Sequence, residues 1–385
     1  MHIDLFNPRS LILFFCLLQG TIFSVLLFLR ASRNKNSSDF WLASLLILLS
    51  LSTVSDFIGF AGVYDVFKQI KDLTFFPFSN PFGYGVLIYL YVQTVSNSKR
   101  KFERRDWLLF IPSIIFYVYQ FLAFAQEISF KNWYENAIHI PFISPFFAVT
   151  AIMFNGYLLF YSIKYYRQYR TWLNENFSDT ETIKFNWLRN FLYLFTAILL
   201  ITALFSLTTN FIFKLSYKQF FWLSLINAFS VYYLAIAGYL RSNSIELNFA
   251  EIKTEEIEGK KSLLSEKELE TLKAKIKNLM INDKIFLEPS LTLNDVARTV
   301  GVNSTVLSYA INIGFEKNFN DFVNQFRIDA VKTKLTNTVD KNLLGVAFDC
   351  GFNSKATFNR SFKKFTGVSP KEFQESLKLS NEVAI

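Results

Sequence analysis

Long apolar stretches alternate with short charged clusters over the first 240 residues of the chain. Seven stretches of about 20 residues or more contain no Asp, Glu, Lys or Arg, except for Asp56 in the second. They are Ser10–Leu29, Phe40–Gly62, Leu73–Ser98, Trp107–Gln126, Asn136–Ile163, Asn190–Phe213 and Gln219–Leu240. After residue 240 the pattern changes to short amphipathic segments rich in Asp, Glu and Lys. The chain therefore divides into two chemically different halves.

Each apolar stretch has the length that a membrane-crossing helix needs, because about 20 residues at 1.5 Å each cross a hydrocarbon layer of roughly 30 Å. Helices are expected, since lipid leaves open backbone groups unpaired and the stretches lack the alternation of barrel strands. The first stretch could also be a cleaved signal peptide, but Asp4 before it and Arg30 and Arg33 after it favour a span. The pattern predicts a seven-helix transmembrane bundle over residues 1–240, with the lipid bilayer as a partner.

Lys and Arg are unevenly distributed between the two sets of loops. The loops after the first, third and fifth stretches hold about twice as many as the other side, including the cluster Lys99, Arg100, Lys101, Arg104 and Arg105. The positive-inside rule then places the N-terminus outside and everything after Leu240 in the cytoplasm. We therefore expect a multi-pass protein of the inner (cytoplasmic) membrane.

Two polar side chains in the apolar half are candidates for sensing a ligand. Asp56 is an acid inside a predicted span, where burial is costly unless the carboxylate is paired or hydrated. It could equally lie near the outer mouth of its span and contact water. His139 also falls on the outward half, as do the pairs Pro77/Pro81 and Pro141/Pro145, which would open helix ends and could shape a pocket.

Residues 241–282 form a polar connector between the halves. Ser265 and Glu268 make a capping box that predicts a helix start. Four apolar residues follow at helical spacing, namely Leu269, Leu272, Ile276 and Leu279. This stripe either packs onto its own domain or forms a dimer seam.

Two helix-turn-helix patterns follow the connector. Leu291–Val300 has helical spacing, Gly301–Ser304 provides a turn and a cap, and a second helix is predicted from Thr305 to about Ile313. About fifty residues later the arrangement recurs in Asn342–Cys350, the turn Gly351–Ser354, and a helix from Lys355 to about Phe365. A long helix over about Asn320–Leu335 is predicted between them.

At these residues the sequence resembles the AraC/XylS family of bacterial transcription regulators. The similarity rests on Gly351-Phe352-Asn353-Ser354 and on the string from Phe358 to Pro370, which includes Arg360, Phe362, Lys363 and Gly367. The first unit also matches, through Leu293, Val296-Ala297, Gly301 and the downstream Arg327. The resemblance covers about 100 residues and implies an AraC-type DNA-binding domain over residues 283–380. The expected fold is all-α, a seven-helix transmembrane bundle followed by two helix-turn-helix units joined by a linker helix.

In a helix-turn-helix the second helix enters the major groove and its exposed face meets base edges. Arg360 can pair with guanine, Asn359 with adenine, and Ala356 or Thr305 can touch a thymine methyl. Lys363 and Lys364 are expected either to contact phosphate or to form a solvated face. The predicted DNA-binding residues are Ser304, Thr305, Ser308, Tyr309, Ser354, Lys355, Ala356, Asn359, Arg360 and Lys363.

Composition narrows the function further. The chain is 51% hydrophobic and only 18% charged, whereas soluble chains carry about 25% charged residues. Two His and two Cys, Cys16 and Cys350, make neither a zinc site nor a disulfide framework, so free buried thiols and no metal or cofactor are expected. No catalytic motif occurs, and we expect no enzyme.

The leading hypothesis is a membrane-bound regulator that senses an extracellular or membrane ligand and reads double-stranded DNA in two successive major grooves. The net charge of residues 281–379 is only slightly positive, so we expect a homodimer to supply additional affinity. Ligand binding would reach the connector through Leu240, and the connector could serve either tethered binding or proteolytic release. The alternative is a transporter or receptor whose cytoplasmic tail is a regulatory interaction module.

Overall fold

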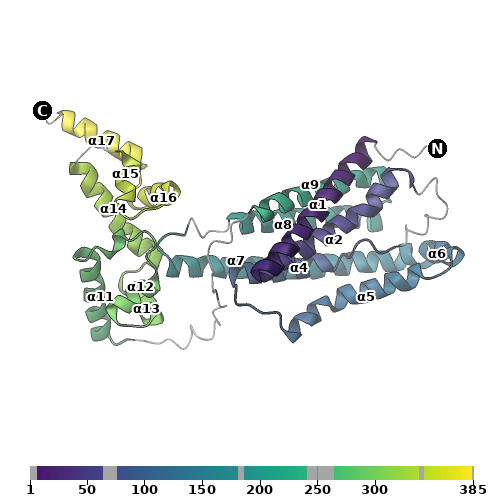
Figure 1. Ribbon diagram of the computed structural model, residues 1–385, viewed down its shortest axis with the longest axis horizontal. Helices are drawn as coiled ribbons and strands as arrows, with labels where there is room; N and C mark the ends of the chain where they lie inside the picture. Colours follow the sequence, from purple (N-terminus) through teal and green to yellow (C-terminus); the bar gives the residue numbers. More distant parts are fainter. Residues whose placement is uncertain are drawn as a thin grey trace. The chain divides into compact units, whose positions relative to one another are not determined.

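The computed structural model describes residues 7–63, 76–180, 186–240, 249, 264–337 and 342–383 (Figure 1). These residues form helices and no strands, apart from one isolated bridge between Phe177 and Thr292, so the predicted all-α class is confirmed. The chain divides into two compact units. One comprises Met1–Tyr166 with Phe185–Ala250, and the other comprises Arg167–Lys184 with Glu251–Ile385.

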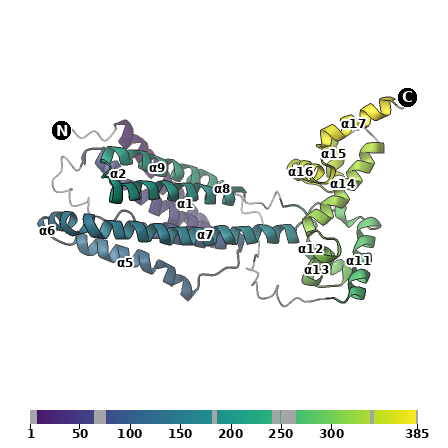
Figure 2. The same ribbon diagram turned by 180° about the vertical axis from the view of Figure 1, so that it is seen from behind.

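The helices of the N-terminal unit follow the predicted apolar stretches, and they run alongside one another (Figures 1 and 2). The first begins where Asn7 caps its N-terminus and Pro8 takes its first position, and it ends at Lys35 in the left-handed conformation. The elements are α1 (Pro8–Asn34), α2 (Ser37–Phe60), α4 (Gly83–Ser96), η2 (Arg104–Asp106), α5 (Trp107–Phe124), α6 (Ile128–Tyr134), η3 (Glu135–Ile143), α7 (Ser144–Asn176), α8 (Asn186–Leu207), η4 (Thr208–Ile212) and α9 (Tyr217–Tyr239).

Six helical segments in the described residues are long and apolar enough to cross a membrane. The third predicted stretch, Leu73–Ser98, is corrected by the structure. Residues 73–75 lie outside the described part, the chain from Phe76 to Phe82 is not helical, and α4 begins only at Gly83, after Pro77 and Pro81. With 14 residues, α4 is about 21 Å long, which is short of a full hydrocarbon layer.

Many large apolar side chains of this unit are exposed, and its buried faces mix small, polar and large apolar side chains. On α5 the buried residues are Ser113 and Phe116, and the exposed ones include Leu108, Ile115 and Leu122. On α1 the buried face holds Ser10, Leu13, Cys16, Gly20, Ser24, Leu27 and Ala31. This distribution is the reverse of a helix that faces water, and it is typical of helices packed within lipid.

Inside the unit, some polar groups pair with partners on other helices. Ser24 on α1 donates to the carbonyl of Ala43 on α2 at 2.8 Å. The Asn155 amide of α7 accepts from the backbone N–H of Gly85 at 2.7 Å and donates to the Pro81 carbonyl at 2.7 Å. These bonds hold helices together where water is absent, because an unpaired polar group there would be costly.

Arg30 and Asp39 form a second polar junction, at the ends of α1, α2 and α9. The Asp39 side chain is almost fully buried, and its carboxylate receives two hydrogen bonds from the Arg30 guanidinium, at 2.7 and 2.9 Å. Arg30 also donates to the carbonyls of Tyr239 and Gly238 at 2.6 and 3.2 Å. The pair thus fixes the end of α9, after which residues 241–248 lie outside the described part of the chain.

The C-terminal unit contains α11 (Glu266–Ile281), η5 (Ile285–Leu287), α12 (Leu293–Val300), α13 (Ser304–Gly314), α14 (Phe319–Asn337), α15 (Leu343–Phe348), α16 (Lys355–Thr366) and α17 (Pro370–Val383). Two hydrophobic cores share α14. The first joins Leu272 and Ile276 of α11 to Val296 and Leu307, so the stripe of the connector helix packs onto its own domain. The second core gathers Phe352, Phe358 and Phe362 with the C-terminal half of α14. Cys350 lies in it, and both cysteines are free and buried.

Arg327 of α14 links the two cores. Its side chain is fully buried and donates to the carbonyls of Phe286 and Glu288 at 2.8 and 2.7 Å. Burial lowers the pKa of Arg327 to about 10, while the nearby carboxylates of Asp179 and Glu288 oppose that shift. The guanidinium is therefore still charged at neutral pH and stays paired inside the domain.

Gly351 also approaches the Phe286 carbonyl. Its φ of +89° lies in the left-handed region, and a Cβ there would lie 2.5 Å from the Phe286 oxygen and 2.9 Å from that of Leu287. Gly301, the equivalent residue of the first turn, has a φ of +80° and open space around its Cβ position. The two turns share a conformation but differ in crowding.

Alanine substitutions at these two glycines should differ in cost. Gly301→Ala incurs only the left-handed penalty of about 1 kcal/mol, whereas Gly351→Ala adds a backbone clash and should lose roughly 2–5 kcal/mol. Pulse proteolysis of the full-length protein in lipid nanodiscs measures the free energy of unfolding of the C-terminal unit. Equal losses for both variants would contradict the role assigned to the crowded turn.

Candidate nucleic-acid interface and sensing cavity

The first helix-turn-helix comprises α12, the turn at Gly301 and α13. Thr292 and Asp295 form a capping box at the start of α12, with the Thr292 hydroxyl donating to the Asp295 carboxylate at 2.6 Å. At the start of α13 the Asn303 side chain accepts from the Val306 backbone N–H at 2.7 Å. Short, well-capped helices around a left-handed glycine produce the turn that the sequence predicts.

The second helix-turn-helix repeats this construction with α15, Gly351 and α16. Here Ser354 is the N-cap, and its hydroxyl accepts from the Thr357 backbone N–H at 3.3 Å. The predicted range Lys355 to about Phe365 agrees closely with α16. The helix buries Thr357, Phe358, Ser361 and Phe362 and leaves its opposite face to solvent.

That solvent face carries most of the predicted contacts of the second unit. Its exposed residues are Lys355, Ala356, Asn359, Arg360, Lys363 and Lys364, and the first five are predicted contacts. In the first unit Thr305 is exposed, while Ser304, Ser308 and Tyr309 are half-buried, and Ser308 accepts a 3.4 Å hydrogen bond from Asn312. The structure thus gathers each predicted set on one helix face, with a more open and more basic face on α16 than on α13.

The two helix-turn-helix units are joined through α14, and an ion pair links α14 to α16. Lys364 of α16 donates to the carboxylate of Asp321 on α14 at 2.6 Å, so it has a partner within the domain in addition to its exposure. Sequence reasoning identified Arg327 as a matching position but gave it no role, and it missed Asp321. A basic or acidic residue in a helical pattern is usually solvent-exposed, and nothing in the pattern signals burial.

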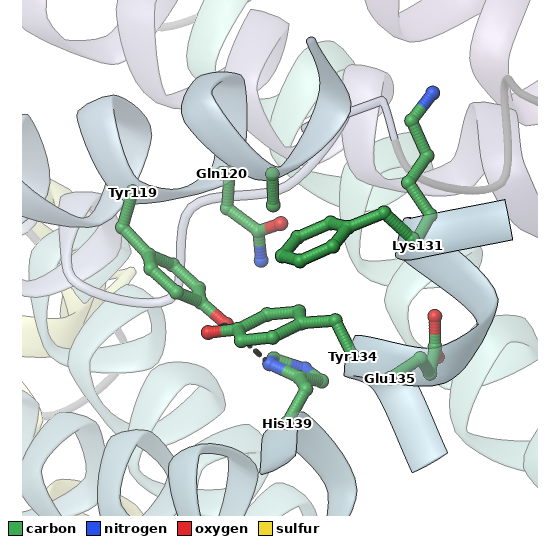
Figure 3. A pocket seen from close by; sticks show the side chains of 8 residues that line it. Tyr119, Gln120, Lys131, Tyr134, Glu135 and His139 are labelled. Atoms are coloured by element: carbon green, nitrogen blue, oxygen red, sulfur yellow. Dashed lines mark hydrogen bonds between the residues drawn. The ribbon is translucent and has the colours of Figure 1, made fainter. Parts of the chain in front are cut away.

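A cavity of about 140 Å³ lies in the N-terminal unit, between α5 and the α6–η3 segment. It is lined by Tyr119, Gln120, Ala123, Phe130, Lys131, Tyr134, Glu135 and His139. Tyr119, Tyr134 and His139 point toward one another (Figure 3). The Tyr134 hydroxyl donates to that of Tyr119 at 3.3 Å, and the Tyr119 hydroxyl is hydrogen-bonded to Nδ1 of His139.

The widened helix η3 places His139 in this cavity. Ser144 donates its backbone N–H to the His139 carbonyl, five residues back, which is the spacing of a π-helix. Pro141 and Pro145 lack backbone N–H groups, so the ordinary four-residue ladder is interrupted at this point. The proline pair that the sequence singled out is therefore part of the cavity's construction.

Asp56 is placed elsewhere. It accepts a 2.6 Å hydrogen bond from Ser224 of α9, and it is not among the residues that line the cavity. The structure thus separates the two predicted sensing residues. Among the described residues no group of three or more His, Cys, Asp or Glu side chains could hold a metal ion.

Comparisons with known proteins match part of the chain. Residues 296–376 match the family described as a helix-turn-helix domain. The melibiose operon regulatory protein of Escherichia coli (strain K12) is 30% identical over 88 residues, which is 23% of this chain and 29% of that protein. An uncharacterized HTH-type transcriptional regulator of Staphylococcus aureus (strain COL) is 32% identical over 91 residues, 24% of this chain and 12% of that protein.

The chain thus spans less than a third of the length of these relatives, and no solved structure matches it. The matched region coincides with the two helix-turn-helix units and their linker helix. The family match and the geometry agree on the same residues. The C-terminal part of this chain is therefore a helix-turn-helix domain of the AraC type.

Proposed function

We propose that this chain is a membrane-anchored, sequence-specific DNA-binding regulator of transcription, with a sensing function in its apolar unit. The observation that carries the proposal is the pair of solvent-facing second helices, α13 and α16, in a domain of AraC type. The relatives are named as a regulatory protein and a transcriptional regulator, which supports the same role here.

The membrane part of the proposal is supported by the outward-facing apolar side chains of the N-terminal unit. Six long apolar helices with large exposed side chains would aggregate in water, whereas lipid is their natural solvent. The excess of Lys and Arg in one set of loops favours an outside N-terminus and a cytoplasmic C-terminus at the inner membrane. In that orientation the helix-turn-helix domain can reach chromosomal DNA.

Each exposed residue of α16 that is predicted to contact DNA has a proposed task. Arg360 and Asn359 would read base edges, Ala356 would contact a thymine methyl, and Lys355 and Lys363 would neutralise phosphates. On α13 the corresponding contacts would come from Ser304, Thr305, Ser308 and Tyr309. The linker helix α14 would hold the two faces about one helical turn of DNA apart, and a homodimer would add affinity that the modest charge does not supply.

Substitutions on α16 should separate base reading from phosphate contact. We expect Arg360→Ala to remove the preference for the selected site, because a bidentate guanine contact supplies about 1–3 kcal/mol of discrimination. Lys363→Ala should weaken binding at all sequences and lower the salt slope by about 1. Fluorescence anisotropy with a selected duplex and a scrambled duplex, over a salt series, measures both effects. Equal losses of Arg360→Ala on the two duplexes would argue against base reading.

The cavity around Tyr119 and His139 is the proposed sensing site. Its volume of about 140 Å³ is close to that of cavities that accept one benzene-sized ring, about 150 Å³. The aromatic side chains offer stacking surfaces, and Gln120 and His139 offer hydrogen-bonding groups. A small ligand with one ring and a polar substituent fits this lining.

A thermal-shift screen can test the cavity. Single-ring metabolites that raise the melting temperature of the full-length protein in nanodiscs should lose this effect in Tyr119→Phe, which removes the hydroxyl bonded to His139. Tyr193→Phe is the matched control, because Tyr193 is 67% exposed on α8. Shifts that persist unchanged in Tyr119→Phe would place the ligand elsewhere.

A further inference from the structure

Three of the four residues that follow α7 are buried within the C-terminal unit, and the first, Phe177, is half-buried. Phe177–Thr180 directly succeed Asn176, the last residue of α7, and they belong to the same compact unit as the helix-turn-helix domain. Ser178 and Thr180 are fully buried and Asp179 is 6% exposed. A polar stretch such as Ser-Asp-Thr is normally found on the surface, so its burial requires dedicated partners.

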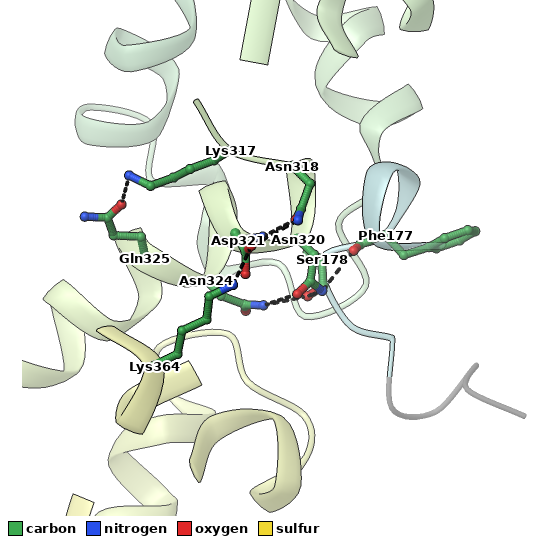
Figure 4. A network of polar contacts seen from close by, with 9 residues as sticks. All are labelled: Phe177, Ser178, Lys317, Asn318, Asn320, Asp321, Asn324, Gln325 and Lys364. Carbon is green, nitrogen blue, oxygen red and sulfur yellow. Dashed lines mark hydrogen bonds and ion pairs between the residues drawn. The ribbon is translucent and has the colours of Figure 1, made fainter. Parts of the chain in front are cut away.

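The backbone of this segment is held by α14 and by the chain before α12. Asn320 donates to the carbonyls of Phe177 and Ser178 at 3.1 and 2.7 Å, and Asn324 donates to the Ser178 carbonyl at 3.1 Å. Figure 4 shows these amides meeting the segment. The Ser178 N–H donates to the Leu291 carbonyl at 3.1 Å. The partners are more than 100 positions away along the sequence.

The side chains of the segment reach the second helix-turn-helix and the linker helix. Thr357, a buried residue of α16, donates its hydroxyl to the Asp179 carboxylate at 3.0 Å. Ser178 Oγ accepts from the Arg327 guanidinium at 3.2 Å. The Asp179 carboxylate also supplies a compensating negative charge to that buried cation. Together with the bridge between Phe177 and Thr292, the segment contacts both helix-turn-helix units.

The docked segment leaves the predicted reading faces accessible. Thr357 lies on the inner face of α16, opposite the exposed Lys355, Asn359 and Arg360. A segment that blocked DNA would cover those side chains instead. The position of Phe177–Thr180 between α12, α14 and α16 suits it to fix the spacing of the two helix-turn-helix units.

We propose that Phe177–Thr180 is an internal brace of the DNA-binding domain, seated between its two helix-turn-helix units, which sets the spacing of the two reading helices and connects that spacing to α7. The proposal rests on the DNA-binding function proposed above. In this proposal a signal from the apolar unit passes through the C-terminal end of α7, as well as through the connector that follows Leu240. Movement or rotation of α7 would then loosen or tighten the brace and change the preferred distance between half-sites.

Hydrogen exchange tests the docking without any DNA. In the full-length protein in nanodiscs, a peptide covering Phe177–Thr180 should exchange slowly, because the segment is buried and the Ser178 N–H is bonded. Thr357→Val keeps the shape of residue 357 but removes the donor to a carboxylate, and we expect exchange about tenfold faster. Thr357→Ser keeps the hydroxyl and should match the wild type, as should Asp329→Ala, which removes an exposed carboxylate from α14.

Fast exchange of this peptide in the wild type, or equal rates in Thr357→Val and the wild type, would overturn the docking. Peptides from α11 should stay protected in every variant, which shows that the domain remains folded. Asp179→Ala provides a second variant that acts on the segment itself, and it should reproduce the effect of Thr357→Val.

A pooled selection of random duplexes by the full-length protein tests the spacing role. The wild type should enrich paired half-sites at one spacing, whereas Thr357→Val and Asp179→Ala should enrich the same half-sites over several spacings. An unchanged single spacing in both variants would overturn the brace. Enrichment of no duplex by the wild type would refute the DNA-binding function and the spacing role with it, while the exchange experiment would still decide the docking.

Discussion

A buried guanidinium must keep its hydrogen-bond partners, and Arg327 imposes this constraint on the whole C-terminal unit. It lies on α14 between the two hydrophobic cores and donates to the chain after α11, through the carbonyls of Phe286 and Glu288. Each buried donor left unpaired would cost about 1–3 kcal/mol, and a charged group costs more. η5, Gly351 and Ser178 all lie close to this one side chain. Arg327 therefore joins the chain after α11 to the second turn, where its guanidinium lies over the Phe352 ring.

In the N-terminal unit, too, buried polar groups need hydrogen-bond partners. Its surface exposes many apolar side chains, and some of its buried polar groups are paired between helices, as Ser24, Asn155 and the Arg30–Asp39 pair illustrate. In the C-terminal unit charged side chains cover the surface and the core is apolar except for the Arg327 cluster. The N-terminal unit thus exposes many apolar side chains and the C-terminal unit exposes charged ones, and each surface suits a different solvent. The proposed membrane location of the N-terminal unit would account for this difference in composition.

The sequence predicted the elements whose signal is local. The 3.6-residue period and the caps locate α13, α14 and α16 within one or two residues, and the same period separates the exposed Arg360 from the buried Phe358 and Phe362. Apolar length predicted most of the long helices but misjudged the third, because Pro77 and Pro81 delay the helix to Gly83 without interrupting the hydrophobic stretch. The length of an apolar stretch indicates that the segment suits an apolar environment, but it does not locate the residue at which the helix begins.

The segment Phe177–Thr180 could not be predicted in this way, because its partners are distant in sequence. Asn320, Arg327 and Thr357 lie more than 140 residues further along the chain, and Ser-Asp-Thr in a polar stretch reads as an exposed loop.

The sequence separation between Phe177–Thr180 and its partners also affects how the proposed regulator would work. A cut in the connector between residues 241 and 263 would free a tail without Ser178 and Asp179, since both precede residue 240. Arg327 would then lose the Ser178 hydroxyl as an acceptor and the Asp179 carboxylate as a compensating charge. Water would enter between the two helix-turn-helix units. Tethered binding keeps the brace attached through α7, so the geometry favours a regulator that reads DNA while still held at the membrane.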